Sequence, residues 1–117
     1  MHVTKHILPV TTNATGDATA YTPPLTGLIN RIEYRKTDYA DGVDFAITVD
    51  GGVEIWTQAD VDASATRYPL VDGNDTDGTA QTGAFAAIAV ADDRVKIVVD
   101  DGGNAKTGTF VIYILGN

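Results

Sequence analysis

The chain has 117 residues, of which 44% are hydrophobic, no cysteine and a formal net charge of −8. This size predicts one domain, residues 1–117, whose core needs no disulfide or thiolate metal site. Its acidity opposes phosphate backbones, and no stretch reaches the ~18 apolar residues of a membrane span. We therefore expect neither a nucleic-acid partner nor a membrane partner.

The residue types favour strands and turns. Fourteen acidic residues are Asp and two are Glu, and the chain holds sixteen Thr and twelve Val. Asp is typical of turns, whereas Thr and Val are typical of strands. Residues 1–37 carry a surplus of two positive charges, and residues 38–77 hold ten acids against Arg67 alone. This split either lets subunits match by charge or reflects Asp at turn tips.

The alternation of apolar and polar residues predicts eight strands. Pro9 lies in the first of them and indicates a sheet edge or a bend, and we expect residues 1–11 to form an edge strand or an arm used in assembly. Pro23-Pro24 ends the second strand. The predicted strands are Val3–Thr11, Ala18–Thr22, Leu28–Lys36, Val43–Val49, Val53–Gln58, Ala84–Val90, Arg94–Val99 and Thr109–Leu115.

Glycine-containing turns connect these strands. Asp50-Gly51-Gly52 predicts a hairpin over residues 43–58, and Asp100–Asn104 predicts a second hairpin that joins the last two strands. We expect one helical turn at Asp60–Thr66 and a polar loop at Asp72–Thr79. Together the elements predict an all-β fold, an antiparallel two-sheet sandwich of the jelly-roll type, with a small barrel as the alternative.

Two kinds of cluster raise the question of a metal. Asp72–Gly78 offers oxygen ligands suited to calcium, but Ala84 stands where an EF-hand loop has its closing bidentate Glu, and Asp100–Asn104 is a weaker version. His2 and His6 lie on one face of a strand, where a transition metal would need carboxylates as further ligands. We expect a solvated loop, a surface pair of histidines, no metal and no cofactor.

Few residues suggest catalysis. Ser64 is the one serine of the sequence and lies in no Gly-x-Ser-x-Gly turn. Glu33 and Glu54 supply the two carboxylates that a glycosidase needs, although both are expected on outward-facing strand positions. A small glycosidase is therefore an alternative, and we expect a chain that is not an enzyme and has no catalytic residues.

Aromatic and arginine side chains are the candidates for contact with a partner. Trp56 either anchors the core, which we favour, or lies exposed and marks a partner or sugar surface. Arginine and tyrosine dominate interface hot spots. The candidates of these types are Tyr34, Tyr39, Arg35, Arg67 and Tyr68.

Six segments, taken together, carry a resemblance to a known family. They are Asp17–Pro23, Arg31–Phe45, Ile55–Thr57, Asp60–Arg67, Asp93–Val99 and Gly102–Thr109. They resemble small virion structural proteins of tailed bacteriophages, most of all capsid decoration or cement proteins that stabilise the head. The resemblance implies a jelly-roll subunit that forms dimers or trimers on the outside of the shell and clamps neighbouring major capsid subunits.

We therefore expect a virion protein on the capsid exterior, made in the cytoplasm of a bacterial host. The absence of cysteine and of an N-terminal apolar run fits this expectation. The expected partners are the major capsid protein and further copies of the chain, and the alternatives are a tail, neck or baseplate component or a carbohydrate-binding module. The candidate contact residues are His2, Ile7, Arg31, Arg35, Tyr39, Arg67 and Tyr68.

Overall fold

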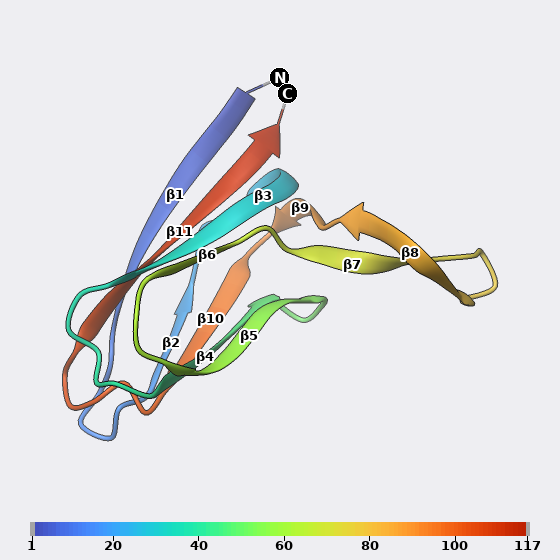
Figure 1. Cartoon of the computed structure of the whole chain (residues 1–117). Helices are drawn as coiled ribbons and strands as arrows, with labels where there is room; N and C mark the ends of the chain where they lie inside the picture. Colours follow the sequence, from blue (N-terminus) through green and yellow to red (C-terminus); the bar gives the residue numbers. More distant parts are fainter. Residues whose placement is uncertain (1, 117) are drawn as a thin grey trace.

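The computed structural model describes residues 2–116, and within them it contains eleven strands and no helix (Figure 1). Met1 and Asn117 lie outside the described residues. No helix in this part of the chain has the length and apolarity to cross a membrane. The strands are β1 His2–Thr11, β2 Ala18–Tyr21, β3 Leu25–Lys36, β4 Val43–Val49, β5 Glu54–Val61, β6 Ala65–Arg67, β7 Leu70–Asn74, β8 Ala80–Ala87, β9 Ala89–Asp93, β10 Val95–Asp100 and β11 Thr107–Gly116.

Two antiparallel sheets pack as a sandwich. Sheet A has the order β1-β11-β3-β6, with β9 also paired to β3, and sheet B has the order β2-β10-β4-β5. The strands form because apolar side chains alternate with polar ones, as in β4, where every second residue is buried. This confirms the predicted all-β, two-sheet fold, and the strand order is compatible with a jelly roll. It also confirms that the first strand lies at a sheet edge, with Pro9 in it.

An aromatic cluster fills the space between the sheets. Tyr34 on β3 and Phe110 on β11 meet Phe45 on β4, with ring centroids 5.2–5.3 Å apart. Trp56 on β5 packs edge-on against Phe45 at 4.9 Å and is only 6% exposed. Its indole N–H donates to the Gln58 side chain at 3.1 Å. Trp56 is therefore a core residue, as favoured from the sequence.

The prediction of a hairpin between the last two strands is wrong. β10 pairs with β2 and β4 in sheet B, whereas β11 pairs with β1 and β3 in sheet A. The Asp-Gly-Gly segment between them is a crossover tied to other loops, because Gly102 N–H donates to the Gly16 carbonyl and the Gly102 carbonyl accepts from Ala40 N–H. The hairpin predicted over residues 43–58 is confirmed by the pairing of β4 with β5.

The predicted helical turn at Asp60–Thr66 is also wrong. β5 continues to Val61, which pairs with Val43, and β6 begins at Ala65. Asp60 adopts a positive φ of 55°, and its N–H donates to Asp44 Oδ1 at 2.9 Å. The Asp44 carboxylate therefore holds Asp60 in a left-handed conformation that a helical turn does not use.

One strand position of sheet A is interrupted by an inserted hairpin. β6 pairs with Ile32–Tyr34 of β3, and β9 pairs further along the same strand, with Leu25–Leu28. Between them the chain leaves the sandwich as the β7–β8 hairpin, which projects to one side in Figure 1. The predicted loop at 72–79 is thus the end of β7 and the tip of this hairpin. The strand predicted over 84–90 is split between β8 and β9 around the buried Ile88.

Candidate functional site

Three of the predicted contact residues, Ile7, Arg31 and Arg35, lie together on the outer face of sheet A. Side chains directly opposite one another on paired strands share a face. The registers of β1, β11 and β3 therefore build four cross-strand rows on this face. The rows are Val3–Leu115–Leu28, Lys5–Tyr113–Arg31, Ile7–Val111–Glu33 and Pro9–Thr109–Arg35.

The charged part of this face has a surplus of positive charge. Arg31 lies over the Tyr113 ring, 3.8 Å from its centroid, and its Nε is 3.5 Å from Glu33. Arg35 also binds Glu33, at 2.9 Å. This hydrogen bond from Arg35 is the main cause of the lowered pKa of Glu33, with the charge of Arg31 adding to it. The ionised Glu33 carboxylate therefore lies beside two guanidinium groups, those of Arg31 and Arg35. Lys5 adds a third positive charge on the neighbouring row.

Part of the apolar surface of the same face is exposed, although Val111 in the Ile7 row is buried. Val3, Ile7 and Leu28 are 52%, 54% and 40% exposed. A groove of about 640 Å³ is lined by Leu28 and Leu115 together with His2, Thr4, Thr26, Gly27, Val90 and Gly116. Exposed aliphatic groups next to arginine and tyrosine are typical of a protein-contact surface.

The structure separates the remaining contact candidates. His2 is on the opposite side of β1 from Ile7, and it lines the groove. Arg67, at the far edge of sheet A, lies 5.3 Å from the Trp56 ring centroid, and the neighbouring Tyr68 is 67% exposed. Tyr39 is wrong as a contact residue, because it is 2% exposed and its hydroxyl donates to the Val10 carbonyl at 2.6 Å.

Sequence reasoning missed part of the face. Val3, Lys5 and Tyr113 belong to it and were not named as candidates. The signal for Val3 and Lys5 was present, because both share the alternation phase of Ile7 in the first strand. No sequence signal placed Tyr113 beside Arg31, since that contact depends on the pairing of β11 with β3.

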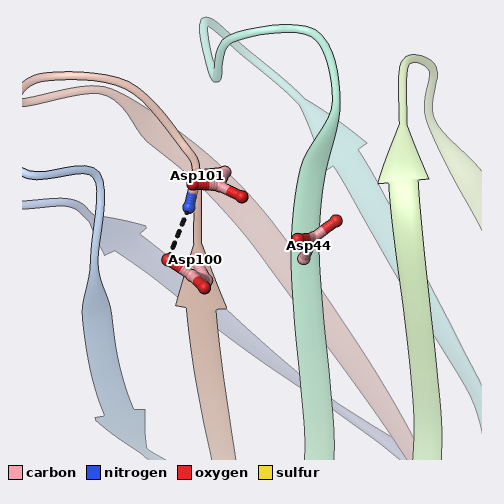
Figure 2. A group of neighbouring side chains, drawn as sticks. All are labelled: Asp44, Asp100 and Asp101. Atoms are coloured by element: carbon pink, nitrogen blue, oxygen red, sulfur yellow. Dashed lines mark hydrogen bonds between the residues drawn. The ribbon is translucent and has the colours of Figure 1, made fainter.

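A second feature is an acidic cluster at the end of sheet B (Figure 2). Among residues 2–116, the one group of three acidic side chains whose carboxylate oxygens lie within 4.8 Å of one another is Asp44, Asp100 and Asp101. Asp44 on β4 is the cross-strand partner of Asp100 on β10, so two like charges stand opposite each other. A side-chain hydrogen bond with Asp17, then the charge of Asp101, raises the pKa of Asp100.

The acidic cluster offers only part of a calcium coordination sphere, because Ca²⁺ takes about 6–8 oxygens. The sequence indicates the Asp100–Asn104 segment as a metal candidate, whereas Asp44 joins it only through the pairing of β4 with β10.

Comparison with protein-family models and with curated proteins finds no match to this chain.

The other predicted metal candidates are not gathered into such a group. In the 72–78 segment, Asp77 accepts a hydrogen bond from Thr79 N–H at 3.0 Å, and Asp75 binds the Gln81 side chain. These carboxylates stabilise the tip of the β7–β8 hairpin, as expected for Asp in turns. His2 and His6 do lie on one side of β1, and within the described part of the chain neither belongs to a group of three ligands.

The two glutamates of the glycosidase hypothesis lie on different sheets. Glu33 is on the outer face of sheet A, and Glu54 is an exposed residue of β5 in sheet B. The lowered pKa of Glu33 is the opposite of what a general acid needs. Ser64 has a structural contact, since its Oγ accepts a hydrogen bond from Lys36 N–H at 2.9 Å. The geometry therefore gives these residues no shared site.

Proposed function

We propose that the chain is a non-enzymatic structural protein of a tailed-phage virion. It oligomerises and binds the outside of the capsid lattice as a decoration or cement protein, with the major capsid protein as its partner. The observation that carries the proposal is the outer face of sheet A, where Arg31, Arg35 and Tyr113 adjoin exposed Val3 and Ile7. A face of this composition is suited to protein contacts.

Binding to an assembled lattice would explain how such a small protein strengthens a shell. A ligand that binds only the assembled state stabilises that state by mass action. Oligomers add avidity, because several modest contacts are made at once. The net charge of −8 favours the exterior of the shell over the DNA-filled interior.

Two other functions have weaker support. A tail, neck or baseplate component would use the same kind of surface in fewer copies. A carbohydrate-binding module needs an exposed aromatic platform, and Trp56, its main candidate, is buried.

The proposal is tested by adding the purified protein to shells of the encoding phage that lack it, and separately to unassembled major capsid protein. We expect saturable co-sedimentation with the shells at a fixed ratio, and a higher temperature of shell disruption. Unassembled capsid protein should bind far less. Equal binding to both forms, or no binding to shells, would contradict the proposal.

A matched pair of charge reversals makes this test specific. Arg35→Glu alters the outer face of sheet A, whereas Lys96→Glu makes the same change on the outward side of sheet B. We expect Arg35→Glu to weaken shell binding, either directly or by reducing avidity, and Lys96→Glu to leave it unchanged. The reverse order of effects would show that the outer face of sheet A is not involved.

A further inference from the structure

The β7–β8 hairpin, called here the arm (residues 70–87), leaves the sandwich with little support of its own. It is a separate two-stranded sheet, and such hairpins are marginally stable alone. Leu70 is 57% and Phe85 64% exposed, while Val71 is partly buried and packs against the core. An arm that exposes large apolar side chains in this way is typical of a segment that a partner covers.

One side of the arm combines apolar and acidic groups. Phe85 stands opposite Asp72, and Leu70, two residues before Asp72, shares its face. The tip adds Asp75 and Asp77, and the sequence has no Lys or Arg from residue 68 to residue 93. The arm is therefore negative as well as apolar.

The outer face of sheet A has the complementary character. In the four cross-strand rows, Lys5, Arg31 and Arg35 stand against one acidic side chain, Glu33, next to exposed Val3 and Ile7. The arm begins at the β6–β9 edge of sheet A, whereas β1 is the opposite edge. Since the arm also projects away from its own sandwich (Figure 1), it is placed to meet this face on another molecule.

We propose that the arm of one copy docks across the outer face of sheet A of a second copy. Leu70 and Phe85 pack against Val3 and Ile7, and the arm carboxylates pair with Lys5, Arg31 and Arg35. Donor and acceptor surfaces differ, so two copies either exchange arms in a two-fold dimer or link head-to-tail into a ring that closes when the rotation permits. The inference rests on the self-association part of the proposed function, and it assigns the outer face of sheet A to a second copy of the chain rather than to the capsid protein.

Light scattering on the purified full chain tests this contact. We expect the wild type to have the mass of an oligomer that shifts toward one chain as salt is raised, because the ion pairs are screened. Leu70→Ser with Phe85→Ser removes the apolar donor, and Lys5→Glu with Arg35→Glu reverses the acceptor. Each double variant should have the mass of a single chain, with an unchanged circular dichroism spectrum. Lys96→Glu, on the other sheet, should remain oligomeric.

Mixing the two double variants gives a sharper result. A chain with an intact face and a chain with an intact arm can make one arm-to-face contact, so the mixture should form dimers and nothing larger. A mixture that stays monomeric would show that the arm of one copy does not bind the face of another. That outcome, a monomeric wild type, or an oligomer unaffected by either double variant would overturn the proposal.

This experiment also separates the arm contact from the virion role. Oligomers that depend on the arm but do not bind shells would leave the arm contact standing and remove the cement role. If the chain binds shells and its oligomers are unchanged by the arm variants, the cement role stands and the arm contact is removed.

Discussion

Tyr34 and Tyr39 stack in the core with nearly parallel rings, their centroids 6.1 Å apart, yet their hydroxyl groups have different surroundings. The Tyr39 hydroxyl donates to the Val10 carbonyl at 2.6 Å. The Tyr34 hydroxyl is buried without a hydrogen-bond partner in residues 2–116. Burial raises the pKa of both side chains, so both stay protonated at neutral pH. Tyr39 thus ties the 38–42 loop to the edge strand β1.

This difference predicts opposite effects for the same substitution. Tyr39→Phe should lower the free energy of unfolding by about 1–2 kcal/mol, because it leaves the Val10 carbonyl without this donor. Tyr34→Phe should leave that free energy unchanged or raise it, because it removes a buried polar group that has no partner. Urea unfolding of both variants measures the two values, and equal losses would contradict the assignment of the Tyr39 hydrogen bond.

Gly108 is predicted to tolerate no side chain. A Cβ there would lie 2.7 Å from Tyr39 Cδ2 and closer still to Cε2. Gly108→Ala should therefore cost about 1–3 kcal/mol by overpacking. Gly52→Ala is the matched control, because its Cβ would meet Val49 at an ordinary 3.7 Å. Thermal melting should show a clear loss for Gly108→Ala and almost none for Gly52→Ala; similar melting temperatures for both would refute the steric account.

The acidic cluster predicts a dependence of stability on pH. The pKa of Asp100 is raised in the folded chain, so its contribution to stability is present below its unfolded pKa and is lost as pH rises through the folded value. Asp100→Asn should therefore be more stable than wild type at neutral pH. The gain should disappear in acid, below the unfolded pKa of the carboxyl group.

Asp41 is the control of opposite sign. A hydrogen bond from Lys36, at 2.7 Å, lowers the pKa of Asp41. Its contribution is present above its unfolded pKa and is lost as pH falls through the folded value. Asp41→Asn should thus be less stable than wild type at neutral pH. Denaturant titrations across the acidic range check both variants, and two shifts of the same sign would show that the assigned causes are wrong.

The burial of Trp56 predicts its fluorescence. The indole is covered by Phe45 and the Arg67 guanidinium, so iodide should quench it weakly in the folded chain and strongly after unfolding. Sugars should leave the emission unchanged. Strong quenching of the folded protein would restore Trp56 as a platform for a carbohydrate.

The sequence was informative where local pattern decides the structure. Alternation predicted most strands, Pro9 predicted the edge position of β1, and Asp50-Gly51-Gly52 predicted the β4–β5 hairpin. These features depend on side-chain phase and turn preference, which neighbouring residues express.

The sequence-based predictions fail where contacts between residues far apart in the chain determine the local structure. Asp100–Asn104 has the composition of a hairpin turn, but contacts with Gly16 and Ala40 make it a crossover between sheets. Asp60 would suit a helix N-terminus, but Asp44 from a paired strand fixes its backbone. Within the arm, β7 and the first half of β8 were not predicted, because they are rich in Ala, Gly and polar residues, which are weak strand formers.

The candidate contact face shows the same division. Arg31 and Arg35 were identified by residue type and Ile7 by its place in the N-terminal strand, and the pairing of β1, β11 and β3 places them on one surface. Tyr39 has the same residue type as good contact residues, but it is a core residue, because the 38–42 loop folds back over Gly108. Residue type alone does not distinguish these two environments.

The proposed virion role is tested most directly by the copy number of the chain in purified phage particles, measured by quantitative staining against the major capsid protein. The account predicts a fixed ratio with as many copies as the shell has equivalent positions, and release of the chain together with loss of shell stability. A few copies per particle would place the chain in the neck or tail. Complete absence from particles would contradict the virion role.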